Sequence, residues 1–307
     1  HMTSAGDLHR PIGSYVNSNA PWGVVLLAHG SQRGTSQREC SCFWQTPATP
    51  SWCQHCPSTP QGLQDAAHRL QRVLGADRAQ VVLACLEFIQ PSPEQAVGGL
   101  AAQGCKRVVL MPYLLGQGKH ATLELEETLE ALRAKFPQMQ LHLAEGLGAD
   151  PRLADLVVER VHALDGFGPN PLGARQTTGV LLVKAGTKTQ YDDCRWLEEL
   201  GQMVERRLGL GYAVSVAQSH YGDPTMEAGA APLVEERGVS SIRCVPYLFF
   251  PGMILRRNVL GGMHRLQEKY PDISLTVTPP LAVDDRLVAV AADRVREVWA
   301  QVEAAEL

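Results

Sequence analysis

Gly23-Val-Val-Leu-Leu-Ala-His-Gly-Ser31 decides the fold, because the chain repeats it as Gly179-Val-Leu-Leu-Val-Lys-Ala-Gly-Thr187, 156 positions later. Each copy contains a short apolar, partly β-branched run, which is typical of a strand covered on both faces of a sheet. A repeat of this kind indicates two similar structural units in one chain.

Three later segments repeat at a smaller shift of 134 positions. They are Gly104–Leu115 with Gly238–Phe249, Leu132–Pro137 with Leu266–Pro271, and Leu147–Leu153 with Leu281–Leu287. The change of shift places roughly 22 extra residues in the first half. The segment from about Gly34 to Gln61 is rich in Cys, Pro, Ser and Thr, so we expect the insertion there.

Short apolar runs alternate with helical patterns within each half. In the first half the runs lie at 24–27, 81–85, 108–111 and 140–144, and the helical patterns at 63–74, 125–136 and 153–164. This alternation predicts an α/β fold of two similar, doubly wound parallel-sheet domains. The two domains would face each other across an active cleft at the carboxyl ends of their strands.

The repeats also set the expected domain boundaries. His1-Met2 looks like a cloning remnant and begins a flexible tail over 1–19. A catalytic half follows over 20–165, then a linker rich in Gly, Pro and Asn over 166–178. The second half runs over 179–307.

Composition narrows the class of protein. The 307 residues suit two domains, and the net charge of -4 without a basic stretch argues against nucleic-acid binding. No apolar run is long enough to span a bilayer, and no secretory leader is present. We therefore expect a cytoplasmic protein that is either a monomer or a homodimer.

Three polar residues of the first half follow predicted strands. His29 ends the first run, Glu87 follows the second, and His120 follows the third at the start of a helix. Two imidazoles and a carboxylate suit a divalent first-row metal and can also accept protons. A single histidine is more often structural, but three such residues at strand tips favour a site.

The second half provides an internal comparison. Ala185 stands where the first half has His29, and Ile254 stands where it has His120. His220 takes the place of Glu87. The fold is repeated but the histidine pair is not, which indicates one catalytic half and one shape-giving half.

Four short motifs now match a known family: Ala28–Ser31, Leu86–Ser92, Pro112–His120 and Asp150–Leu153. The chain resembles the sirohydrochlorin cobaltochelatases and sirohaem ferrochelatases in their internally duplicated long form. The resemblance implies insertion of Co²⁺, or of Fe²⁺, into sirohydrochlorin without ATP, in cobalamin or sirohaem biosynthesis. It also implies that His29 and His120 hold the ion and help to deprotonate the macrocycle, with Glu87 assisting.

Sirohydrochlorin carries eight carboxylates, so its site should contain cationic and polar groups. The expected substrate-binding residues are Ser31, Lys119, Lys184, His220, Arg256 and Arg257. Guanidinium and ammonium groups are the usual partners of carboxylates. Ordinary solvated surface charge is the alternative interpretation of each cation.

The inserted segment carries its own candidate metal site. Cys40, Cys42, Cys53 and Cys56 fall within 17 positions. In a chain without a secretory signal, such a cluster indicates metal binding rather than disulfides. Four thiolates suit an iron–sulfur cluster or, alternatively, Zn²⁺, although the spacing is standard for neither. A loop without metal is the third possibility.

Other functions remain open from the sequence. A protohaem ferrochelatase would need a more apolar pocket, and a non-catalytic metal or tetrapyrrole carrier would use the same histidines for binding only. An iron–sulfur redox sensor would depend on the cysteines alone. A nucleotide loop at Gly116–His120 is disfavoured, because Tyr113 occupies the position of the first glycine and His120 that of the Ser/Thr.

Overall fold

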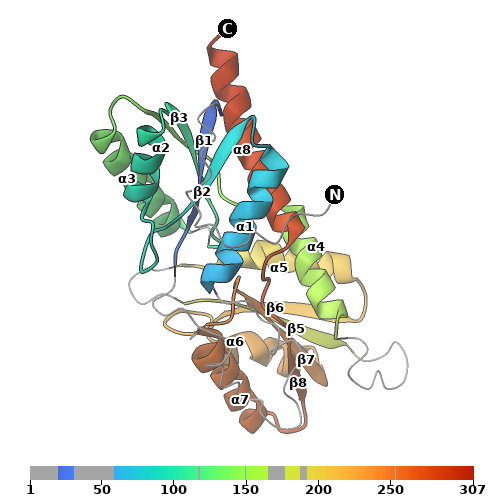
Figure 1. The fold of residues 1–307 in the computed structure, drawn as a ribbon. Coiled ribbons are helices and arrows are strands. Elements are labelled where there is room, and N and C mark those ends of the chain that lie inside the picture. The colour runs from blue at the N-terminus through green and yellow to red at the C-terminus, as the bar shows by residue number, and fades with distance from the viewer. Residues whose placement is uncertain are drawn as a thin grey trace.

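The computed structural model describes residues 20–30, 59–116, 118–148, 150–164, 177–186, 192–252 and 254–307 (Figure 1). Strands and helices alternate through both halves. The first half contains β1 (Trp22–Ala28), α1 (Thr59–Leu74), β2 (Ala79–Cys85), α2 (Pro93–Ala102), β3 (Arg107–Pro112), α3 (Lys119–Lys135), β4 (Gln140–Leu143) and α4 (Pro151–His162). The second contains β5 (Thr178–Lys184), α5 (Arg195–Leu208), β6 (Tyr212–Gln218), α6 (Met226–Ala231), the π-helical turn η5 (Pro232–Glu236), β7 (Ser241–Tyr247), the π-helical turn η6 (Ile254–Val259), α7 (Leu260–Lys269), β8 (Ser274–Val277) and α8 (Asp285–Ala305).

The strands form two four-stranded parallel sheets with the same order, β2-β1-β3-β4 and β6-β5-β7-β8. In each sheet the second strand in sequence lies on one side of the first strand, and the third strand lies on its other side. The first and third strands are therefore neighbours at the switch point, where such sheets bind ligands beyond their carboxyl ends. The predicted fold of two doubly wound parallel sheets is confirmed.

Alternate side chains of β1 enter different cores, as the pleat of a strand requires. Val25 and Leu27 pack with α2 and α3 on one face of the first sheet. Trp22, Val24 and Leu26 pack on the other face, in a cluster that continues into the second sheet. The second sheet likewise has its own outer cluster under α6 and α7. One continuous core thus joins the two halves.

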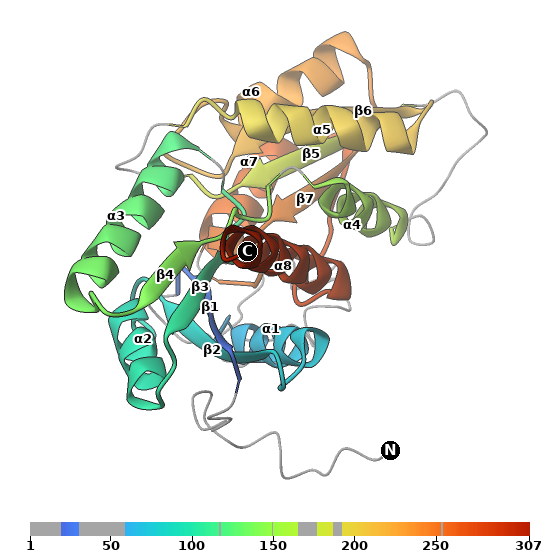
Figure 2. The ribbon, with the colours of Figure 1, turned by 90° about the horizontal axis from the view of Figure 1, so that it is seen from above.

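Two helices cross from their own half to the other. α4 follows the first sheet in sequence but packs against α5 and β7, whereas α8 follows the second sheet and packs against α1 and β3. The two helices also contact each other. In Figure 2, α8 is seen nearly end-on in the middle of the molecule, between α1 and α4. The predicted boundaries at residues 165 and 179 stay predictions, and this exchange couples the halves on either side of them.

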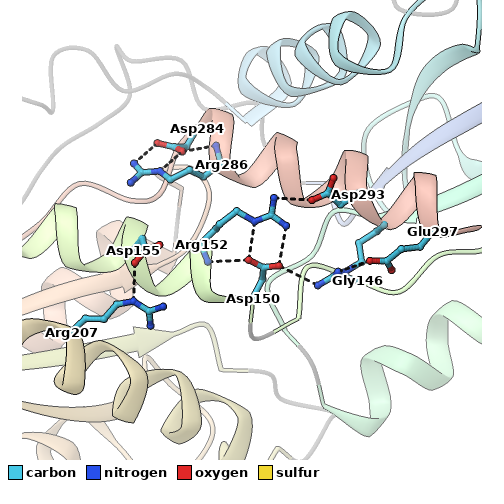
Figure 3. A network of polar contacts seen from close by, with 10 residues as sticks. Gly146, Asp150, Arg152, Asp155, Arg207, Asp284, Arg286, Asp293 and Glu297 are labelled. Carbon is cyan, nitrogen blue, oxygen red and sulfur yellow. Dashed lines mark hydrogen bonds and ion pairs between the residues drawn. The ribbon is translucent and has the colours of Figure 1, made fainter.

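Paired charges repeat across this exchange with approximate two-fold symmetry, and Figure 3 shows the two capping pairs, Asp150–Arg152 and Asp284–Arg286. The Asp150 carboxylate caps α4 and binds the Arg152 guanidinium, whose Nη1 reaches Asp293 of α8 at 2.9 Å. Asp284 caps α8 and binds Arg286 in the same way. The Nη1 atom of Arg286 in turn lies 2.8 Å from Glu159 Oε2 of α4. Each capping pair therefore links its helix to the helix of the other half.

A second pair of arginines holds the loops before these helices. Arg160 of α4 donates to the carbonyls of Pro280 and Leu281, at 3.3 and 3.0 Å. Arg294 of α8, the residue 134 positions later, donates to the Gly146 carbonyl at 3.1 Å. The two arginines thus tie each helix to the other half's loop.

Several element ends differ from the sequence prediction. The helix expected from residue 63 begins at Thr59, whereas the helix expected to start at His120 begins one residue earlier, at Lys119. The apolar periodicity detects only the buried turns, and the polar first turn of a helix is invisible to it. No helix among the described segments has both the length and the apolar character of a membrane span.

We predict that Arg160→Met lowers the free energy of unfolding by about 1–3 kcal/mol, because two backbone carbonyls lose a charged donor. Urea unfolding followed by tryptophan fluorescence and by circular dichroism would measure the change. Both signals should move together, since the exchanged helices make the halves unfold as one unit. Arg206→Met, at an exposed position of α5, is the control. Two separate transitions, with only one displaced, would contradict the coupling.

Candidate active site

His29 and Glu87 meet at the carboxyl edge of the first sheet. His29 directly follows β1, and Glu87 lies two residues beyond β2. The Glu87 amide donates to the His29 carbonyl at 2.9 Å, and the Leu86 amide donates to the Ala28 carbonyl at 2.8 Å. Both side chains are exposed. The structure therefore brings these two predicted site residues together.

A glycine makes this approach possible. Gly30 has a φ of +90°, and a methyl group on it would collide with the Glu87 carbonyl oxygen. Gly186 is its counterpart in the second half, where a methyl group would collide with the His220 carbonyl. Both halves thus keep the backbone of the site, although only the first has a histidine before the glycine.

An exposed aromatic residue follows Glu87 in the first half and His220 in the second. Phe88 and Tyr221 have φ of 63° and 60°, a left-handed conformation that is unusual for residues with a side chain. Their exposures are 64% and 67%. Such strained, exposed residues cluster at ligand sites more often than in ordinary loops.

His120 is the second residue of α3, which starts beyond the neighbouring strand β3. The Tyr113 amide, just after β3, donates to the Leu27 carbonyl at 2.7 Å. β3 therefore lies beside β1 up to its end, and α3 begins farther along the chain, at Lys119. The side chains of Lys119 and His120 lie outside the described part of the structure.

The second half approaches α3 through Asp192. A methyl group on Gly118, the N-cap of α3, would lie 3.6 Å from Asp192 Cγ. Nearby, the rings of Tyr113 and Phe249 are stacked at 4.5 Å between their centres. The carboxyl edges of the two sheets therefore face each other, as the sequence predicted.

Asp192 forms a buried ion pair with Lys184, whose Nζ lies 3.0 Å from Oδ2. The Trp196 indole also donates to this oxygen, at 2.9 Å. Burial alone would raise the pKa of Asp192, but hydrogen bonds from a backbone amide, the Trp196 indole and Lys184 hold that pKa below its ordinary value. Lys184 is only 7% exposed, so its charge is already paired with this carboxylate.

His220 is held by its neighbour Ser219, whose Oγ lies 2.5 Å from the imidazole Nδ1. The Gly186 amide donates to the same hydroxyl oxygen at 3.2 Å. Burial, and then the nearby Lys184 ammonium, hold the pKa of His220 below its ordinary value. The imidazole is therefore neutral near pH 7, unlike the carboxylate at the corresponding position of the first half.

A pocket of about 560 Å³ opens beside His220. It lies among the loop after β6, the start of α6, and the η6–α7 helix. The lining side chains with charge or hydrogen-bonding capacity include His220, Tyr221, Asp223, Glu227, Arg257, Asn258 and Arg265. The pocket therefore contains two of the predicted substrate-binding residues, His220 and Arg257.

The other predicted residues are placed differently. Arg256 is 8% exposed and does not line this pocket, although its neighbour Arg257 does. Ser31 lies outside the described residues, as does the cysteine box of Cys40, Cys42, Cys53 and Cys56. Within the described segments no group of three or more His, Cys, Asp or Glu side chains is arranged to hold a metal, but the His120 side chain is not among them.

Sequence reasoning missed Asp192 and Arg265. Asp192 follows a stretch that differs in length between the halves, so the repeat offered no counterpart for it. Arg265 was detectable, because it lies eight positions after Arg257, a spacing that returns to one helix face.

The family model CbiX matches residues 53–164 and 179–298. The first match begins after β1, so it does not include His29. A sirohydrochlorin ferrochelatase of Priestia megaterium is 26% identical over 170 residues, which are 55% of this chain and 60% of that relative. A sirohydrochlorin cobaltochelatase of Sulfurisphaera tokodaii is 30% identical over 98 residues, 32% of this chain and 78% of that relative.

Solved structures show the same fold. SirB from Bacillus subtilis with Fe³⁺ has a TM-score of 0.66 at 18% identity, covering 92% of this chain and 97% of SirB. The CbiX described as the terminal enzyme for biosynthesis of sirohaem in denitrifying bacteria has a TM-score of 0.53 at 15% identity, covering 90% of this chain and 98% of that one. These similarities are similarities of backbone fold.

We predict that Gly30→Ala and Gly186→Ala each lower the free energy of unfolding by about 2 kcal/mol or more, because alanine is strained at positive φ or meets a carbonyl oxygen. Gly99→Ala is the control, since it lies in α2 with nothing within 4 Å of a new methyl group. That change should raise stability by up to about 1 kcal/mol. Chemical denaturation would measure all three, and a stable Gly30→Ala variant would contradict the tight contact with Glu87.

Proposed function

The chain belongs to the CbiX family, and we propose that it is a chelatase that inserts a divalent metal ion, Co²⁺ or Fe²⁺, into sirohydrochlorin. The named relatives act on this tetrapyrrole, and their names include both metals.

One observation carries the proposal. His29 and Glu87 are joined through their backbones at the carboxyl edge of β1 and β2, and His120 is the second residue of α3, the helix that follows β3. This edge faces the second half across Gly118 and Asp192. Nitrogen and oxygen ligands gathered at the switch point of a parallel sheet suit an incoming first-row metal ion.

The reaction requires two events at this edge. The metal ion must exchange its water for pyrrole nitrogens, and two pyrrole protons must leave the macrocycle. We propose that His29 and His120 hold the ion by weak, replaceable bonds, as neutral imidazoles do. Glu87 and these imidazoles would accept the protons. We propose that this reaction proceeds without ATP.

The second half is proposed to bind substrate without handling metal. Ala185 cannot ligate an ion, and His220 is engaged through Nδ1 with Ser219. The buried Lys184 is neutralised by Asp192, so it is better suited to fixing the wall of the cleft than to meeting a carboxylate. The expected cytoplasmic location and monomeric or dimeric state stay predictions.

We predict that His29→Ala and His120→Ala each reduce sirohydrochlorin metalation by about 10²–10⁴-fold, the usual contribution of a general base, with the loss of a metal ligand added to it. Absorbance spectra recorded after addition of Co²⁺ or Fe²⁺ would follow turnover. His264→Ala removes an exposed imidazole from α7 and should keep the wild-type rate. Near-normal rates in both site variants, with intact circular dichroism, would overturn the assignment, and tetrapyrrole binding without turnover by the wild type would favour a carrier.

We propose separately that Cys40, Cys42, Cys53 and Cys56 bind one metal centre that chelation does not require. Four thiolates are a sufficient ligand set for an iron–sulfur cluster or for Zn²⁺. Protein purified without oxygen should contain stoichiometric iron and sulfide, or zinc, and should lose it in Cys53→Ala/Cys56→Ala. The variant should keep metalation of added sirohydrochlorin. Metal-free wild-type protein would refute the centre, and loss of activity together with the metal would refute its independence.

A further inference from the structure

The pocket beside His220 has a chemical character that the first half lacks. We propose that Arg257, Arg265 and the Nε2–H group of His220 form a subsite for carboxylate arms at the edge of the tetrapyrrole. This inference rests on the proposed function and adds to it the group that each residue recognises. Guanidinium groups bind carboxylates with two parallel hydrogen bonds and are the usual residues for this role.

The internal repeat shows that the charge is specific to this half. At the shift of 134 positions, Arg257 corresponds to Leu123 of α3 and Arg265 corresponds to Ala131. Leu123 is 51% exposed, so the equivalent surface of the first half is apolar rather than cationic. The same backbone therefore carries metal-handling residues in one half and two arginines in the other.

The two guanidinium groups are available to a ligand. Neither arginine forms an ion pair with a carboxylate of the described residues, even though Asp223 and Glu227 also line the pocket. Both arginines are exposed at the pocket surface, Arg257 on η6 and Arg265 on α7. An external carboxylate can therefore approach them without first displacing an internal partner.

The floor of the pocket is built by close helix packing. A methyl group on Gly262 of α7 would collide with the Met226 sulfur at the start of α6. The first half has Thr128 at the corresponding position. The glycine lets α7 approach α6, and this fixes the helix that carries Arg265 against the loop that carries His220.

Ser219 holds His220 by a short contact. The Gly186 amide donates to Ser219 Oγ, and this oxygen lies 2.5 Å from the imidazole Nδ1. In the proposed subsite the hydroxyl donates its proton to Nδ1, and the proton of the neutral ring is on Nε2. A ring in this tautomer offers Nε2–H to a carboxylate and no free lone pair to a metal ion. In the proposed subsite, His220 thus provides a hydrogen-bond donor at the position where the first half has the Glu87 carboxylate.

Equilibrium binding of metal-free sirohydrochlorin tests the subsite without any metal insertion. Arg257→Gln and Arg265→Gln should each raise Kd by about tenfold, the effect of losing one charge-assisted hydrogen bond. The double variant Arg206→Gln/Arg237→Gln removes the same charge from exposed positions of the second half that do not line the pocket. This control should change Kd by no more than about twofold.

Substitutions of His220 add a test of its proton. His220→Gln keeps an N–H donor near the position of Nε2 and should weaken binding less than His220→Leu, which has none. His220→Glu restores the residue type of the first half and should weaken binding most, because its carboxylate repels the ligand. Equal losses in all three variants would overturn the donor role.

The outcomes separate this inference from the proposed function. Wild-type protein that neither binds nor metalates sirohydrochlorin would overturn the proposed function itself. Wild-type protein that does both, with the same Kd in Arg257→Gln/Arg265→Gln as in the Arg206→Gln/Arg237→Gln control, would overturn the subsite alone. A raised KM with a preserved kcat in the pocket variants would support it, as expected for lost uniform binding.

Discussion

The exchange of α4 and α8 between the halves is the constraint on which the rest of the structure depends. Each sheet is covered on one face by a helix from the other half. The arginines of the capping pairs Asp150–Arg152 and Asp284–Arg286 also form ion pairs with the exchanged helix of the other half. An exposed ion pair contributes little by itself. These pairs matter through their geometry, because they cap the first turns of α4 and α8, and the apolar faces of these helices belong to the shared core. The carboxyl edges of the two sheets are thereby fixed face to face.

The duplicated backbone keeps its geometry in the loops that follow the first two strands of each sheet, although the side chains there differ. Gly30 and Gly186 keep the same close approach to a carbonyl, and Phe88 and Tyr221 keep the same left-handed conformation. A substitution at these positions would disturb both the loop and the neighbouring strand, so they are constrained in either half. Side chains that point from the same backbone into open space are free to change. This explains why the fold repeats while the chemistry does not.

The repeat predicted both sheets, because short apolar runs and helical periodicity are properties of the local sequence. It could not predict the exchange of α4 and α8, since an apolar helix face fits the sheet of either half equally well. The positions of His29 and Glu87 followed from strand ends alone. Asp192 could not be found in this way, because its contact with Gly118 joins residues from different halves. Long-range packing decides such contacts, and no local pattern encodes it.

Arginines placed away from the edge that is proposed to hold the metal ion would have an electrostatic advantage. A guanidinium about 10 Å from a divalent ion repels it by about 3 kcal/mol at an effective dielectric constant near 20. Two arginines beside His29 would therefore oppose entry of the ion that the histidines are proposed to hold. Arg257 and Arg265 stand instead in the pocket of the other half, where they would attract the acidic substrate of the proposed reaction. Among the described residues that approach α3, Lys184 is paired with Asp192, so its positive charge is offset within the second half. The second half can thus attract an anion while the first accepts a cation.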